Sequence, residues 1–195
     1  MRIIDVGVTV WEWRDIPPTR YTLNAKSSDT RSTHMGLVRI KTDEGIEGEA
    51  FLGSALSNLG GDAQLIVDRY KPLLIGQDPL NRERIWQSMA GWAMGSVMRV
   101  IGAIDVALWD LAGKAAGIPI HQLMGSYRTS VPAYASSAVF ATTEEYAEEA
   151  LRYKEAGWNA YKIHPPAIAE WDIQICKAVR EAVGDDYRIM LDSTW

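Results

Sequence analysis

The sequence has little cysteine, no long hydrophobic run and no excess of positive charge. Its one cysteine, Cys176, cannot form a disulfide within the chain, which is typical of proteins from a reducing compartment. No apolar run approaches the roughly 18 residues that a membrane-spanning helix needs, and Met1–Val6 alternates in polarity with an early acid, unlike a signal peptide. The formal net charge of -5 argues against a nucleic-acid-binding protein, which would carry a basic stripe. We therefore expect a cytoplasmic protein without nucleic-acid or membrane partners.

The 195 residues, 47% of them hydrophobic and 23% charged, indicate a globular chain of one or two domains. Apolar periodicity in the first half changes from steps of two to steps of three or four. In chain order we expect strands at about 4–13, 33–41 and 46–52, followed by helices at about 62–74, 81–92 and 98–116. Asp43-Glu44-Gly45 supplies a turn between the second and third strands, and Asp62 is a candidate N-cap.

The second half has the alternation of strand and helix that is typical of a parallel sheet. We expect strands at about 131–137, 159–164 and 187–191, with helices at about 143–156 and 166–183 between them. Thr143 is the candidate N-cap of the first of these helices.

The segment 102–114 reads Gly-Ala-Ile-Asp-Val-Ala-Leu-Trp-Asp-Leu-Ala-Gly-Lys, and Gly117-Ile118-Pro119 and Leu123-Met124-Gly125 follow it. With these motifs the chain resembles the enolase superfamily, in its mandelate racemase/muconate lactonizing enzyme branch. The resemblance implies an α+β N-terminal capping domain at residues 1–126, then the first βα units of an incomplete (β/α) TIM-type barrel at 127–195. It also implies magnesium-assisted removal of the proton α to a carboxylate. We interpret Asp105 and Asp110 of the motif as structural side chains that cap, pair or hydrogen-bond within the fold.

A candidate site lies at the ends of the predicted strands of the second half. Lys162 and His164 are two residues apart, so on a strand both side chains project from the same face. Asp192 ends the next strand, and residues at the carboxyl ends of barrel strands form the active-site face. A base near neutral pH, a cation and an oxygen ligand would then be neighbours. The alternative for His164 is a polar strand end held extended by Pro165-Pro166.

By resemblance, Asp192 matches the family's first metal-binding aspartate, which implies Mg²⁺ as cofactor. Lys162 matches the first lysine of a Lys-x-Lys pair that contacts the substrate carboxylate or supports the base. His164 stands where the second lysine, the base, would be. The sequence also departs from the family's Asp-x-Asn at Asp192-Ser193-Thr194.

The polar stretch at about 14–32 is either a lid or a disordered excursion. By resemblance it matches the family's substrate-specificity loop, in which Arg20, Tyr21 and Lys26 are candidate contacts to an anionic substrate, although solvated loop charge is the simpler interpretation for each. A small-molecule carboxylate is therefore the expected substrate. The family also leads us to expect a homo-oligomer.

Three predicted strands cannot close a barrel, which needs eight βα units, and the family's further metal-binding glutamates on later strands are missing. We therefore do not expect this chain to be a working enzyme alone. One hypothesis makes it the N-terminal half of an acid-sugar or hydroxy-acid dehydratase, with racemisation, epimerisation and cycloisomerisation as alternative reactions. The other makes it a truncated, non-catalytic interaction module or one subunit of a split barrel.

Overall fold

The computed structural model describes residues 1–14, 32–53, 59–91 and 98–193. The chain divides into two compact units, and the boundary between them follows Tyr127. Each unit has a hydrophobic core of its own. None of the helices in the described ranges combines the length and the hydrophobicity that a bilayer crossing demands.

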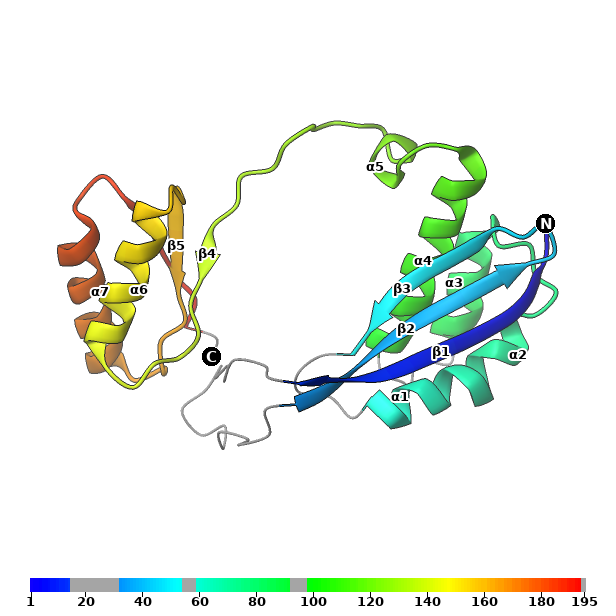
Figure 1. Ribbon diagram of the computed structural model, residues 1–195, viewed down its shortest axis with the longest axis horizontal. Coiled ribbons are helices and arrows are strands. Elements are labelled where there is room, and N and C mark those ends of the chain that lie inside the picture. Colours follow the sequence, from blue (N-terminus) through cyan, green and yellow to red (C-terminus); the bar gives the residue numbers. More distant parts are fainter. Residues whose placement is uncertain (15–31, 54–58, 92–97, 194–195) are drawn as a thin grey trace. The chain divides into compact units, whose positions relative to one another are not determined.

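The first unit consists of an antiparallel sheet with helices on one face (Figure 1). Its strands are β1 (Ile3–Arg14), β2 (Ser32–Thr42) and β3 (Glu47–Leu52), in the order β1-β2-β3. Its helical segments are α1 (Leu59–Leu65), the π-helical η1 (Ile66–Tyr70), α2 (Lys71–Leu74), α3 (Arg82–Ala90), α4 (Met98–Ala116) and α5 (Ile120–Leu123). The expected strands and the long helix at 98–116 are confirmed.

The hairpin between β2 and β3 turns at Gly45, whose φ of 79° favours glycine. A register shift at the start of β1, between Ile3 and Asp5, changes which side chains face the core. Ile3 is buried there, whereas Ile4, which simple alternation groups with Val6, is exposed.

Helix α4 packs closely on β3, because β3 has a glycine where the helix approaches. A Cβ at Gly48 would overlap the carbonyl oxygen of Ala107 and the Cβ of Leu111. Next to this contact, the Glu49 N–H donates to an Asp110 carboxylate oxygen at 2.8 Å. Asp110 also pairs with Lys114 at 2.7 Å, so the interpretation of Asp110 as a structural side chain is confirmed.

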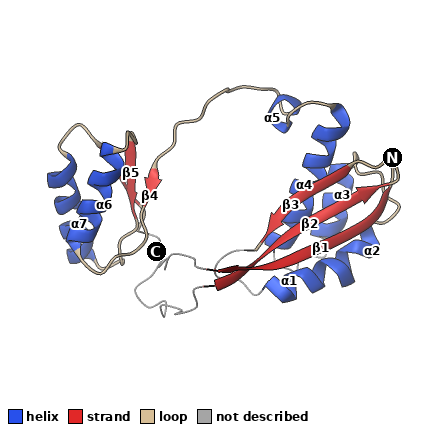
Figure 2. Cartoon of the chain, in the orientation of Figure 1, coloured by secondary structure: helices blue, strands red, loops and turns tan. Residues whose placement is uncertain are grey.

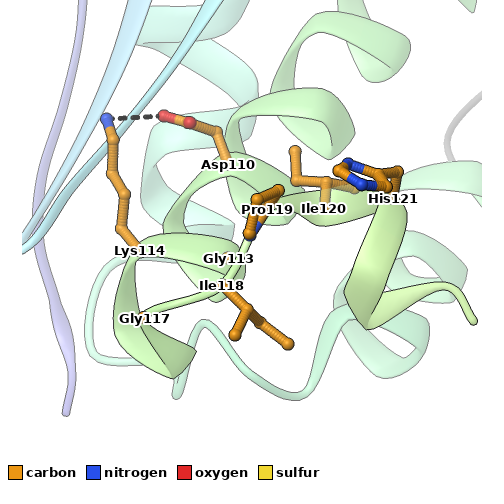
Figure 3. Close-up of a pocket in the computed structure, with 8 residues that line it drawn as sticks. All are labelled: Asp110, Gly113, Lys114, Gly117, Ile118, Pro119, Ile120 and His121. Carbon is orange, nitrogen blue, oxygen red and sulfur yellow. Dashed lines mark ion pairs between the residues drawn. The ribbon is translucent and has the colours of Figure 1, made fainter. Parts of the chain in front are cut away.

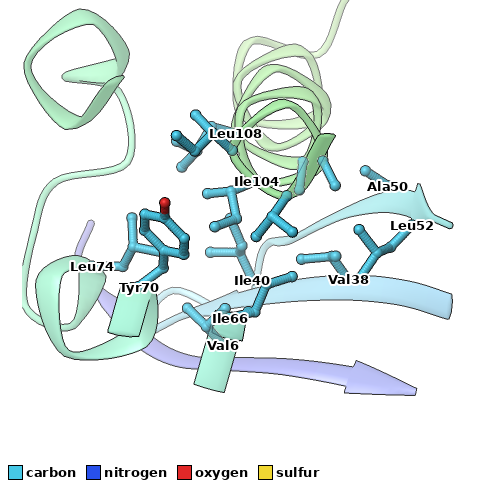
Figure 4. Packing of buried hydrophobic residues seen from close by; sticks show 14 of the residues in the cluster. Val6, Val38, Ile40, Ala50, Leu52, Ile66, Tyr70, Leu74, Ile104 and Leu108 are labelled. Atoms are coloured by element: carbon cyan, nitrogen blue, oxygen red, sulfur yellow. The ribbon is translucent and has the colours of Figure 1, made fainter. Parts of the chain in front are cut away.

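The core of the first unit lies between this sheet and the helices (Figure 4). Its buried members include Val6, Val38, Ile40, Ala50 and Leu52 from the strands, and Ile66, Tyr70, Leu74, Ile104 and Leu108 from the helical segments. The apolar stripe of α4 is therefore what holds the helix to the sheet.

Two details of the expected first helix are wrong. The helix begins at Leu59 and contains the π-helical turn η1, so it is not one regular α-helix. Asp62 is not its N-cap, because it lies inside α1 and accepts hydrogen bonds from Arg99 Nε at 2.6 Å and Nη2 at 2.8 Å. This buried carboxylate joins α1 to the start of α4.

The second unit contains a three-stranded parallel sheet in the order β4-β5-β6. Its elements are β4 (Ala135–Ser136), α6 (Thr143–Glu155), β5 (Ala160–Ile163), α7 (Ala169–Val183) and β6 (Arg188–Leu191). Both helices lie on the same side of β4 and β5 (Figure 2). On β5, Tyr161 and Ile163 are buried in the core with side chains from α6 and α7, which leaves Lys162 on the opposite face.

The limits of three expected elements need correction. Strand β4 has two residues instead of the expected seven, and α7 begins at Ala169 instead of Pro166. The N-cap of α6 is Thr142, not Thr143, because Thr142 Oγ1 accepts the Glu145 N–H at 3.3 Å and the Glu145 carboxylate accepts the Thr142 N–H at 3.0 Å. This reciprocal pair is a capping box.

Candidate functional site

The carboxyl ends of β5 and β6 bring three polar side chains together. The parallel register places Lys162 beside Met190 and Ile163 beside Leu191. The Asp192 N–H then donates to the Ile163 carbonyl at 2.9 Å, which continues the ladder by one residue. Asp192 therefore lies level with the end of β5, where Lys162 and His164 project.

The Asp192 carboxylate lies between the other two side chains. Its Oδ2 is 2.9 Å from Lys162 Nζ and 3.3 Å from His164 Nε2. The hydrogen bond to Asp192 raises the pKa of the Lys162 ammonium, so this group stays charged at neutral pH. The carboxylate is 39% exposed and the lysine side chain 19%, so the cluster remains open to small molecules on the carboxylate side.

Three residues that were not among the sequence-based candidates contact His164. Ser137, which follows β4, accepts the His164 N–H on Oγ at 2.8 Å, and its carbonyl oxygen is 2.9 Å from His164 Nδ1. Ser136 Oγ is 3.3 Å from the same nitrogen. Tyr146 of α6 donates its hydroxyl hydrogen to the His164 carbonyl at 2.8 Å. The only signal in the sequence was the position of the two serines at the end of an expected strand.

Burial raises the pKa of the Tyr146 phenol to about 12. The hydroxyl is therefore protonated at neutral pH and remains a donor to His164, while it accepts the Phe140 N–H at 3.0 Å. The phenol thus links two main-chain groups, the Phe140 N–H and the carbonyl of His164 in the site.

The described residues supply only one acidic side chain to this cluster. Among them, no three histidine, cysteine, aspartate or glutamate side chains are grouped as a metal site would need. Magnesium prefers several oxygen ligands in an octahedral arrangement, so Asp192 fits as one ligand and is not sufficient by itself. The expected substrate contacts Arg20, Tyr21 and Lys26 lie outside the described residues.

A pocket of about 500 Å³ in the first unit lies between the end of α4 and α5 (Figure 3). The ion pair of Asp110 and Lys114 borders it, and His121 lines its other part. Asp110 already accepts a hydrogen bond from β3. The pocket therefore shows no group of side chains arranged for catalysis.

The sequence matches two family models. Residues 6–125 match the mandelate racemase/muconate lactonizing enzyme N-terminal domain, and residues 145–195 match the enolase C-terminal domain-like family. The chain belongs to the mandelate racemase/muconate lactonizing enzyme family. The resemblance inferred from the motif around α4 is thereby confirmed, and with it the capping domain followed by parallel βα units.

Curated relatives in this family have different reactions. D-galactarolactone cycloisomerase from Agrobacterium fabrum is 36% identical over 84% of this chain, and D-xylonate dehydratase from Haloferax volcanii is 34% identical over 82%. The chain spans 44% of the length of each. Other relatives include an L-talarate/galactarate dehydratase and an N-succinyl-L-Arg/Lys racemase.

A solved structure of D-glucarate dehydratase from Agrobacterium tumefaciens, complexed with magnesium, matches this fold with a TM-score of 0.79. It is 31% identical, and the match covers 98% of this chain and 53% of that protein. Homologues of this chain thus include acid-sugar dehydratases, cycloisomerases and racemases, and enzymes of this superfamily generally bind Mg²⁺.

Proposed function

We propose that this chain forms the first part of a magnesium-dependent active site that removes the proton α to a carboxylate. The observation that carries the proposal is the cluster of Lys162, His164 and Asp192 at the carboxyl ends of β5 and β6. A base, a cation and an oxygen ligand meet there within hydrogen-bonding or ion-pairing distance. The remaining parts of the site would come from the half of the fold that the relatives have and this chain does not span.

Each side chain has a chemical role in this proposal. Asp192 is one ligand of Mg²⁺, which, when bound, offsets the negative charge that builds on the substrate carboxylate as the proton leaves. Lys162 carries a positive charge next to Asp192 and contacts the substrate carboxylate or supports the base. His164 accepts the proton, because an imidazole can take up and return a proton near neutral pH.

The substrate class that we propose is an acid sugar or a related hydroxy acid, and the reaction is its dehydration. Support comes from relatives whose names describe dehydratases of xylonate and of talarate and galactarate. Racemisation and cycloisomerisation begin with the same proton removal and are represented among the relatives too. Product analysis with a panel of sugar acids distinguishes the three outcomes.

The test of the base uses His164→Ala in the full-length protein. We expect exchange of the substrate α-proton with deuterated solvent to be lost, because the imidazole that accepts the proton is removed, while magnesium binding is retained. His121→Ala is the matched control, since His121 is exposed in the first unit. Exchange at the wild-type rate in His164→Ala would remove His164 from the role of base.

A further inference from the structure

We propose that Tyr134 is a positioning residue for Lys162, which it holds where the lysine can contact the substrate carboxylate. The inference rests on the proposed function, because it concerns how a side chain of the same cluster is kept in place. It extends the site from β5 and β6 to the neighbouring strand β4.

Tyr134 lies on the face of the sheet from which Lys162 projects. In the parallel pairing of β4 and β5, Ala135 lies beside Tyr161 and Ser136 beside Lys162. Ala135 and Tyr161 are buried in the core, so the residues before and after Ala135 point away from the core, as Lys162 does. Ser136 is exposed and Tyr134 is 45% exposed. Tyr134 therefore borders the cluster from the side of β4.

The ring of Tyr134 contacts the end of the lysine side chain. Lys162 Nζ lies 5.5 Å from the ring centroid, within the distance of about 6 Å at which an aromatic face attracts an ammonium group. A lysine carries its positive charge at neutral pH without help from its neighbours, so this contact does not depend on a shifted pKa. The same Nζ is 2.9 Å from Asp192 Oδ2. Lys162 is thus held between an aromatic ring next to β4 and a carboxylate that follows β6.

Asp192 by itself is a poor anchor for the lysine, because its carboxylate has other contacts. Its Oδ2 also lies 3.3 Å from His164 Nε2, and the same carboxylate is the proposed ligand of Mg²⁺. The face of an aromatic ring does not compete for this metal, which prefers oxygen ligands. A lysine side chain that is already restricted loses less conformational freedom when the substrate binds. We therefore expect Tyr134 to strengthen substrate binding through Lys162.

The test measures substrate binding in the full-length protein. The probe is the sugar acid whose α-proton exchanges fastest in a panel that includes D-xylonate and galactarate, and His164→Ala is present throughout so that it binds without reacting. We expect Tyr134→Leu to raise the Kd roughly 3- to 10-fold, because the ring that attracts Lys162 is lost. Tyr134→Phe keeps the ring and should bind within about twofold of the protein that has Tyr134.

A second measurement shows whether Tyr134 acts through Lys162. In a protein with Lys162→Met, adding Tyr134→Leu should change the Kd by less than about twofold, because no lysine is left to position. Tyr187→Leu is the matched control, since this tyrosine is buried and precedes β6, at the opposite end of the strand from Asp192. We expect it to lower the melting temperature without changing the Kd.

The outcomes separate the two proposals. The positioning inference is wrong if Tyr134→Leu binds as tightly as the protein with Tyr134, if Tyr134→Phe loses as much as Tyr134→Leu, or if Tyr134→Leu weakens binding equally with and without Lys162. If Lys162→Met itself binds the sugar acid normally, the role proposed for Lys162 fails and the inference fails with it. If no sugar acid of the panel exchanges its α-proton, the proposed function fails first.

Discussion

At the scale of single residues, the start of α6 depends on which of two adjacent threonines is the N-cap. Thr142 has an extended backbone, and its side chain and that of Glu145 satisfy each other's main-chain N–H groups. The Thr143 hydroxyl instead lies 3.0 Å from Glu144, a neighbouring side chain. Only Thr142 therefore compensates for the hydrogen bonds that the first turn of a helix lacks.

We predict that Thr142→Ala lowers the free energy of unfolding by about 1 kcal/mol, the usual cost of losing an N-cap side chain. Thr143→Ala is the matched control and should change it by less than about 0.5 kcal/mol, since no cap is lost. Chemical denaturation monitored by circular dichroism measures both. Equal losses in the two variants would contradict the assignment of the cap.

The candidate site shows what short sequence patterns can and cannot predict. Lys162, His164 and Asp192 could be selected because the two-residue period of strands and the common edge of a parallel sheet are local rules. Ser137 and Tyr146 could not be selected in this way. Their contacts to His164 span 27 and 18 residues along the chain, and they depend on how β4 and α6 pack. The sequence also does not distinguish Thr142 from Thr143 as the N-cap of α6, since either residue satisfies the sequence preference for that position.

At the scale of elements, the contact between α4 and β3 explains the motif that identifies the family. Ala107 and Leu111 press against Gly48, while Asp110 accepts the Glu49 N–H and Lys114 Nζ donates to the Glu47 carbonyl at 2.9 Å. The polar side chains of the motif thus satisfy main-chain groups of an edge strand. The helix can bind in this way only because the strand has no side chain at Gly48.

We predict that Gly48→Ala lowers the free energy of unfolding by about 1–3 kcal/mol, because the added methyl group has to push α4 away from β3. The matched control is Gly7→Ala in β1, where an added Cβ has no neighbour within 4 Å. This variant should be neutral or slightly more stable, since alanine restricts the unfolded chain. A Gly48→Ala protein as stable as Gly7→Ala would show that α4 is not closely packed.

The order of the elements followed from periodicity, whereas several of their details did not. The register shift that exposes Ile4 and the π-helical turn η1 each depend on one residue more or less than the regular period provides. Packing against the hydrophobic core determines where such an irregularity occurs, and the periodicity of the sequence does not reveal the position. The same holds for Asp62, whose partner Arg99 lies on a different helix, so the local sequence around Asp62 does not reveal the contact.

At the scale of the whole molecule, the chain combines a capping domain that has its own hydrophobic core with βα units of the kind that form a barrel. Strands β4, β5 and β6 are neighbours in the order of the sequence, as in a sheet that continues around a barrel. The relatives are more than twice as long as the aligned part. A metal site at the rim of such a sheet would take its ligands from several strands. One of these ligands, Asp192, follows β6.

We predict that Asp192→Asn in the full-length protein weakens magnesium binding at least about tenfold, because loss of even an outer-shell partner commonly costs that much. An amide also loses the charge that attracts the cation, and it pairs less well with Lys162. Asp185→Asn is the matched control, since Asp185 is exposed in the turn between α7 and β6. Calorimetric titration with magnesium measures both affinities, and an unchanged affinity in Asp192→Asn would exclude Asp192 as a ligand. Because His164 is not a ligand in this scheme, His164→Ala should bind magnesium like the wild type, which separates loss of the metal from loss of the base.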